Sequence, residues 1–129
     1  MNIPENLLYT KEHEWARLEG SQATVGITDY AQSSLGDITF IELPKAGDEM
    51  EQSKALATVE SVKAASDVYA PLSGNIVKVN EDLEASPELI NQSPYENGWF
   101  AVIEIANEKE KEGLMSASDY KAYVETLSK

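Results

Sequence analysis

Short segments of alternating or β-branched residues, each bounded by turn-forming residues, run through most of this chain. Such segments are typical of β-strands, because successive side chains of a strand point to opposite faces. The pattern predicts strands over residues 14–18, 23–27, 38–43, 54–60, 65–70, 76–79 and 99–105. So many short strands bury their apolar faces mainly against one another, and we therefore expect a mainly β fold, a flattened β-barrel or sandwich.

Helical signals are few and lie between or after these strands. Thr28 is expected to cap a short helix that ends at Gly36, and Ser86 to cap another with Pro87 at its first position. Ser116 is expected to begin a C-terminal helix that covers one end of the strands. The apolar side chains of that helix follow at helical spacing, at Tyr120, Tyr123, Val124 and Leu127.

The length of 129 residues and the absence of a linker-like stretch predict a single domain, 1–129. The chain has no cysteine, and His13 is its only histidine. Disulfides, thiolate nucleophiles, Cys- or His-rich metal sites and a Ser-His-Asp triad are therefore excluded. Sulfur chemistry would need a cofactor that brings the sulfur. His13 is expected to be packed or hydrogen-bonded rather than catalytic.

The chain is strongly acidic. It has 10 Lys and Arg against 23 Asp and Glu, a formal net charge of −13. Nucleic acids and anionic membranes are unfavourable partners for such a surface, whereas basic patches on proteins are favourable ones. We also find no secretory signal and no apolar run long enough for a membrane span, so a bacterial cytoplasm is expected, with a mitochondrial matrix the less favoured location.

Lys63 stands out by its position. The strands over 54–60 and 65–70 meet at a tight turn over 61–64, which would present the amine of Lys63 clear of the body on a rigid support. Its neighbour Ala64 is small. Taken alone, an exposed lysine is far more often a solvated surface residue than a functional one.

The residues around Lys63 change that assessment. Glu60 lies three residues before the lysine and Ala64 one after it, and the Pro-Leu-Ser-Gly turn over 71–74 follows. This combination resembles the attachment site of lipoyl carrier domains and, among them, the H-proteins of the glycine cleavage system. The resemblance extends along the chain through the segments 13–15, 26–28, 35–37, 91–95 and 98–99.

The resemblance implies a barrel-sandwich hybrid with short peripheral helices and a C-terminal helix, and a lipoyl-domain-like core over 23–106. It also implies that (R)-lipoate is joined to Lys63 by a lipoyl-attaching enzyme, with Glu60 and Ala64 as parts of the attachment site. The chain would then be a carrier and not an enzyme, with no catalytic residue and no metal of its own.

The partners that the resemblance implies are three enzymes. A pyridoxal-phosphate-dependent glycine decarboxylase loads an aminomethyl group onto the lipoyl sulfur. A tetrahydrofolate-dependent aminomethyltransferase takes the one-carbon unit and releases ammonia. Dihydrolipoamide dehydrogenase then reoxidises the dithiol, and tethering raises the effective concentration of the arm near each docked enzyme.

Two carboxylates are candidates for binding the loaded arm. Glu12 and Glu14 are two residues apart and would share one face of a strand, where they could bind an amine or simply line a solvated edge. The resemblance implies that Glu14, together with Asp67, binds the amine of the aminomethyl group when the arm folds into a cleft. A direct role for Glu12 stays open.

Three other interpretations compete with a lipoyl carrier. Biotin carriers use the same fold and the same turn lysine but flank it with methionines, where this chain has Val62 and Ala64. An unmodified lipoyl-like interaction protein would also retain the site. An enzyme using Glu12 and Glu14 is the least favoured, because no nucleophile or electrophile accompanies them.

Overall fold

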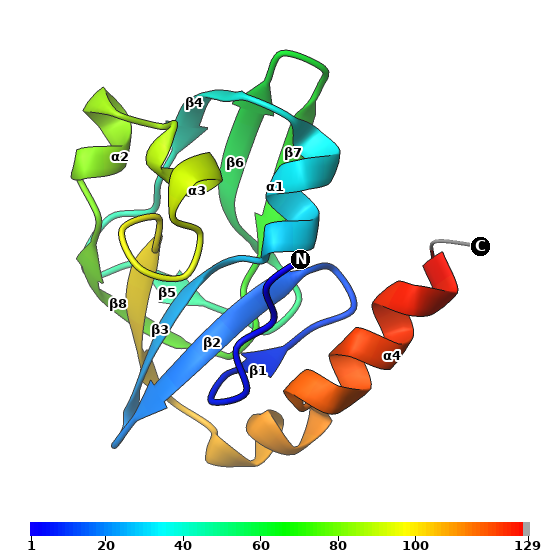
Figure 1. The fold of residues 1–129 in the computed structure, drawn as a ribbon. Coiled ribbons are helices and arrows are strands. Elements are labelled where there is room, and N and C mark those ends of the chain that lie inside the picture. The colour runs from blue at the N-terminus through cyan, green and yellow to red at the C-terminus, as the bar shows by residue number, and fades with distance from the viewer. Residues whose placement is uncertain (128–129) are drawn as a thin grey trace.

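The computed structural model describes residues 1–127 and builds them from nine strands and short helices (Figure 1). The last two residues of the predicted domain lie outside the described part. The strands are β1 (Leu8–Tyr9), β2 (Glu14–Glu19), β3 (Gln22–Ile27), β4 (Ile38–Glu42), β5 (Glu49–Met50), β6 (Ala55–Ser61), β7 (Ala65–Tyr69), β8 (Gly74–Val79) and β9 (Ala101–Ile105). All seven predicted strands are present, so the mainly β prediction is confirmed.

The strands form two antiparallel sheets. A six-stranded sheet has the order β1-β2-β3-β9-β8-β5, and a three-stranded sheet has the order β4-β6-β7. The described residues thus form two separate sheets and not one closed barrel. Within the small sheet, β6 and β7 make a hairpin whose tip projects from one end of the molecule (Figure 1).

The helices are short except for the last. They are α1 (Asp29–Leu35), α2 (Asp82–Ala85), α3 (Leu89–Gln92), the 3-10 helix η1 (Glu108–Gly113) and α4 (Ala117–Leu127). The hydroxyl of Thr28 accepts from the N–H of Ala31, and Gly36 ends α1 with a φ of 78°, as predicted. The Oγ of Ser116 accepts from the N–H of Asp119 and caps α4.

One helix prediction is wrong. The helix expected from Ser86 begins only at Leu89, and Ser86 instead follows the unpredicted helix α2. Residues 86–90 turn through i→i−3 bonds, in which the N–H groups of Leu89 and Ile90 donate to Ser86 and Pro87. The Ser-Pro pair therefore joins two single-turn helices instead of opening one longer helix.

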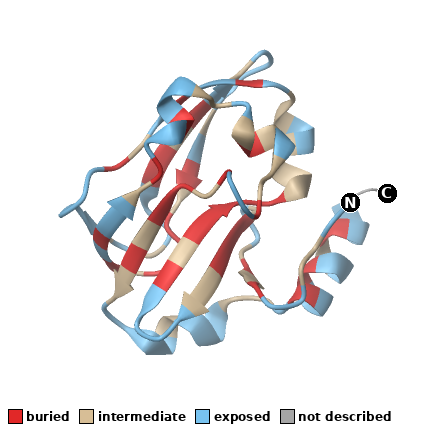
Figure 2. Ribbon diagram, turned by 60° about the vertical axis from the view of Figure 1, so that its left-hand side comes forward, coloured by how far each residue is buried: buried red, intermediate tan, exposed pale blue. Residues whose placement is uncertain are grey.

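The main core lies between the sheets, where buried positions alternate with exposed ones along the strands (Figure 2). A second cluster packs α4 against the start of the chain and includes Tyr9, Trp15 and Tyr120. Gly26 is needed here, because a Cβ at that position would lie 2.8 Å from the ring of Trp15. In the helix that covers this end, Tyr120 and Val124 are buried but Leu127 is 42% exposed.

His13 packs beside this second cluster, where its ring contacts Tyr30 and Tyr120. Its Nδ1 lies 2.8 Å from the hydroxyl of Tyr120, which lies 2.7 Å from the hydroxyl of Thr28. The chain of hydrogen bonds ties α4 to the residue before β2 and to the cap of α1. Burial lowers the pKa of His13, which favours the neutral, packed imidazole.

Candidate functional site

The tip of the β6–β7 hairpin presents Lys63 to solvent on a tightly bonded turn. The N–H of Ser61 donates to the carbonyl of Ala64 at 2.8 Å. The Oγ of Ser61 accepts from the N–H groups of Lys63 and Ala64 at 3.1 and 3.2 Å. The hydroxyl thus closes the turn together with this backbone bond, a role that the sequence analysis missed although serine is a frequent turn residue for this reason.

A second contact fixes the turn from the side. The N–H of Val62 donates to the carbonyl of Asp37 at 3.1 Å, so the segment between α1 and β4 lies against the tip. A Cβ at Gly36 would lie 3.5 Å from Cε of Lys63. Gly36, which ends α1, therefore lies beside the aliphatic part of the lysine at ordinary contact distance.

Glu60 and Ala64 lie beside Lys63 without binding its amine. Glu60 is exposed on β6 opposite Phe40 of β4, and its carbonyl accepts from the hydroxyl of Thr39 at 3.2 Å. Ala64 contributes its backbone to the turn. The geometry supports both residues as parts of the surface that surrounds the lysine.

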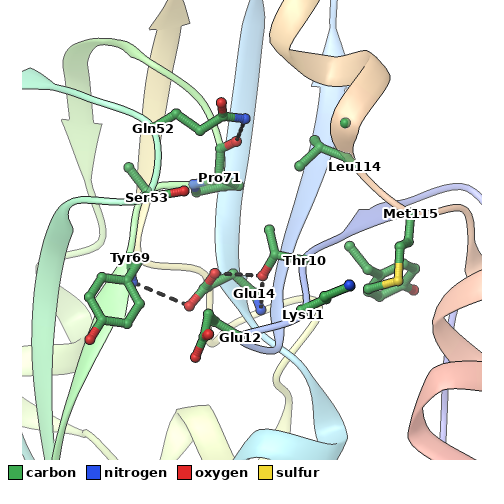
Figure 3. A pocket seen from close by; sticks show the side chains of 13 residues that line it. Thr10, Lys11, Glu12, Glu14, Gln52, Ser53, Tyr69, Pro71, Leu114 and Met115 are labelled. Atoms are coloured by element: carbon green, nitrogen blue, oxygen red, sulfur yellow. Dashed lines mark hydrogen bonds between the residues drawn. The ribbon is translucent and has the colours of Figure 1, made fainter.

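A cleft of about 580 Å³ lies where the end of β7 approaches β1 and the start of β2 (Figure 3). Apolar side chains and carboxylates share its lining, which is made of Tyr9, Thr10, Lys11, Glu12, Glu14, Gln52, Ser53, Tyr69, Ala70, Pro71, Gly113, Leu114 and Met115. One wall comes from the segment that follows η1. The carboxylate of Glu110 holds that helix to the β7–β8 turn by accepting from the N–H and Oγ of Ser73 at 2.7 and 2.8 Å.

Glu14 is the polar centre of the cleft. It is only 3% exposed, accepts from the hydroxyl of Thr10 at 2.6 Å, and accepts from the N–H of Tyr69 at 3.2 Å (Figure 3). Burial raises the pKa of this carboxyl to about 7; the two hydrogen bonds oppose the rise, and the nearby charge of Glu12 adds to it. The carboxyl can therefore change its ionisation when a charged group arrives.

Glu12 lines the cleft, but the backbone around it is not the strand that the sequence predicts. It precedes β2 and is exposed, and His13 between the two glutamates has a φ of 71°. The shared strand face expected for Glu12 and Glu14 is therefore absent. Both side chains line the cleft nonetheless, because the chain turns at His13.

Asp67 and Lys63 do not line the cleft, although Asp67 shares β7 with Tyr69, which does. Asp67 is exposed on β7 and accepts from the hydroxyl of Thr58 at 3.2 Å. It faces the same side of β7 as Tyr69, two residues further on. Strand β7 thus runs from the lysine, past Asp67, to the cleft, and its four steps cover about 13 Å. A lysine side chain alone does not span that distance.

Among residues 1–127, no group of three or more His, Cys, Asp or Glu side chains is arranged to hold a metal ion. No helix in the same part of the chain is both long and apolar enough to cross a membrane.

Comparisons with known proteins agree with one another. The family model "Glycine cleavage H-protein" matches residues 7–127. The glycine cleavage system H protein of Halothermothrix orenii is 54% identical over 127 residues, covering 98% of this chain and 99% of that protein. The one from Oceanobacillus iheyensis is 51% identical over 125 residues, covering 97% and 99%. The crystal structure of a glycine cleavage system H protein from Mycobacterium marinum is similar with a TM-score of 0.84 at 35% identity, covering 93% of this chain and 97% of that chain.

Proposed function

The chain belongs to the glycine cleavage H-protein family, and we therefore propose that Lys63 carries (R)-lipoate in amide linkage. The chain is a lipoyl carrier of the glycine cleavage system. The observation that supports the attachment point is the exposed lysine on a closed turn, whose strand leads to a cleft centred on Glu14. We also propose that 1–129 acts as one domain, with 23–106 as its lipoyl-domain-like core.

The residues of the cleft fit a lipoyl arm. Its apolar side chains Tyr9, Leu114 and Met115 suit a hydrocarbon chain and a sulfur ring, and its carboxylates suit an amine. The span of about 13 Å along β7 requires an extension of Lys63 of this kind. When bound, lipoate supplies two sulfurs that take up the aminomethyl group and electrons.

Within this proposal, Glu14 and Asp67 bind the amine of the cargo while the arm lies in the cleft. An ammonium group near Glu14 favours its ionised form, so amine binding releases a proton from a carboxyl whose pKa is about 7. Burial among the cleft residues also restricts the access of water to the cargo. The chain thereby protects the group that it carries.

The partners are those that the family implies. Glycine decarboxylase would load the arm, aminomethyltransferase would unload it, and dihydrolipoamide dehydrogenase would reoxidise it. A lipoyl-attaching enzyme would modify Lys63 first, using Glu60 and Ala64 as part of its recognition site.

The test is intact mass spectrometry of the protein from its native cell, with Lys63→Arg as the variant. We expect one lipoyl increment on the wild type and none on Lys63→Arg, because a guanidinium stays protonated and is not acylated. The variant should fold with a free energy of unfolding within about half a kcal/mol of the wild type. A biotinyl increment, or glycine cleavage supported by Lys63→Arg, would refute the proposal.

A further inference from the structure

The Pro-Leu-Ser-Gly turn over 71–74 contains a hydrogen-bond centre that the proposed function does not use. The Oγ of Ser73 accepts from the N–H of Gln52 at 2.8 Å and donates to Oε2 of Glu110 at 2.8 Å. The N–H of Ser73 donates to the other carboxylate oxygen of Glu110 at 2.7 Å. One serine thus joins the segment before β6, the β7–β8 turn and η1. We call Gln52, Ser73 and Glu110 the clasp.

Further bonds hold the same segments together. The side-chain amide of Gln52 donates to the carbonyl of Pro71 at 3.0 Å. The carbonyl of Ser73 accepts from the N–H of Ala106, just before η1, at 3.0 Å. Next to Gln52, Ser53 has a φ of 70°, a left-handed backbone conformation that residues other than glycine adopt infrequently. Such a conformation persists because the surrounding bonds hold the segment in place.

The segments that the clasp joins also form the walls of the cleft. Their lining residues are Gln52, Ser53, Pro71, Gly113, Leu114 and Met115. Figure 3 shows Gln52 on one side of the cleft and Leu114 on the other. Ser73 and Glu110 do not belong to the lining, so they act on an arm in the cleft only through these walls.

The wall that follows η1 depends on hydrogen bonds more than on burial. Helix η1 has no buried side chain, and Leu114 and Met115 are half-buried. Two backbone bonds between Met115 and Tyr9, at 2.7 and 2.8 Å, fix the far end of this wall. The bonds from Ser73 to Glu110 fix its near end. Because segments with little buried apolar surface open at low cost, loss of the Glu110 bonds would free the near end first.

We propose that the clasp holds the wall after η1 closed over the arm of Lys63, and that Glu110 is a positioning residue for retention of the aminomethyl cargo. This inference rests on the proposed function, because it concerns a lipoyl arm on Lys63. Cargo loss consumes one water: the C–N and C–S bonds break, and the products are ammonia, formaldehyde and the free thiol of the arm. A closed wall restricts the access of that water.

The experiment measures ammonia release from lipoylated protein that glycine decarboxylase has loaded and that is then purified. The variants are Glu110→Ala and Ser73→Ala. The matched control is Glu104→Ala, because Glu104 accepts from the Oγ of Ser21 at 2.7 Å in a bond of the same kind outside the cleft. We expect roughly three- to ten-fold faster release in both clasp variants and the wild-type rate in the control. Glu110→Gln keeps one acceptor oxygen and should give an intermediate rate.

Two further measurements separate a loosened wall from a weaker fold. Amide hydrogen exchange should quicken at Leu114 in the clasp variants and keep the wild-type rate at Val59, which is fully buried in β6. The double variant of Ser73 and Glu110 should release ammonia no faster than either single variant, because both substitutions break the same bonds. Thermal unfolding checks that each variant folds.

Three outcomes would overturn the role of the clasp while lipoylated Lys63 stands. They are wild-type ammonia release in both clasp variants, an equal increase in Glu104→Ala, and faster release with equally faster exchange at Val59. The last of these would assign the loss to unfolding of the whole domain. A wild-type protein that carries no lipoyl increment would overturn the proposed function itself, and the clasp would have no arm to retain.

Discussion

Glu14 is a carboxyl whose environment sets its chemistry. At 3% exposure it keeps only the hydroxyl of Thr10 and the N–H of Tyr69 as hydrogen-bond donors, and burial raises its pKa to about 7. Near neutral pH the carboxyl therefore exchanges readily between its two forms. An exposed glutamate would be fully ionised there and paired with water, which weakens its hold on an amine.

This pKa makes stability depend on pH in a defined direction. The ordinary pKa of 4.5 applies to the unfolded chain and about 7 to the folded one, so the folded protein binds more protons between these values. The free energy of unfolding should therefore fall as pH rises through this interval, by up to about 3 kcal/mol from this group. The Glu14→Gln variant has no carboxyl that titrates at this position. The difference in the free energy of unfolding between wild type and variant therefore isolates the contribution of Glu14. Denaturant unfolding at several pH values checks it, and a constant difference would contradict it.

Retention of the cargo tests Glu14 and Asp67 together. If both bind the amine, Glu14→Gln and Asp67→Asn should each release ammonia several-fold faster from the purified loaded protein, because a charge-assisted bond is worth about 1.5–3 kcal/mol. Folding and lipoylation should change little. Ammonia is measured without aminomethyltransferase, and Glu19→Gln serves as the control. If both variants release ammonia at the wild-type rate, Glu14 and Asp67 do not bind the amine. The assignment of the chain as a carrier would be unaffected.

At the scale of elements, the β6–β7 hairpin supports Lys63 on a turn that is closed by a backbone hydrogen bond and by the side chain of Ser61. The Oγ of Ser61 binds two N–H groups of the turn, and Asp37 binds a third at Val62. Such a turn holds the lysine away from the body in a fixed direction, which a flexible loop would not do. An arm attached to Lys63, as we propose, would therefore move while its base stays fixed.

Removing that hydroxyl should loosen the tip. Ser61→Ala is expected to cost about 1 kcal/mol and to speed amide hydrogen exchange at Lys63 and Ala64, because both N–H groups lose their acceptor. Ser66→Ala on the same hairpin is the control, since its Oγ makes only a 3.5 Å contact. NMR exchange rates measure the effect. Unchanged exchange at Lys63 and Ala64 would show that the backbone bonds alone close the turn.

Over the whole molecule, the formal net charge is −13, and we expect this charge to steer association with basic surfaces on partners. Docking to glycine decarboxylase should slow several-fold between low and physiological salt, because screening within roughly 10 Å weakens steering by the acidic surface. Stopped-flow association rates test this, with the dissociation rate as an internal control that should change less. If the association rate stays constant between low and physiological salt, electrostatic steering is refuted. Shape and the arm would then be the recognition elements.

The local sequence determined much of the fold. The seven predicted strands, the capping roles of Thr28, Gly36 and Ser116, and the turn under Lys63 follow from residue patterns a few positions long, which fix backbone direction locally. Ser86 shows where local patterns fail, because its predicted helix cap lies instead in a turn between α2 and α3.

The tertiary structure alone decided which segments meet. The division into a six-stranded and a three-stranded sheet depends on pairings between distant segments, such as β3 with β9. It also made Glu14 a buried carboxyl and left Glu12, two residues away, exposed, because β7 and Thr10 close over only one of them. Burial and pKa depend on neighbours remote in sequence, so no local pattern predicts them. The sequence thus determined which lysine we propose as the attachment point, and packing created the cleft to which β7 leads.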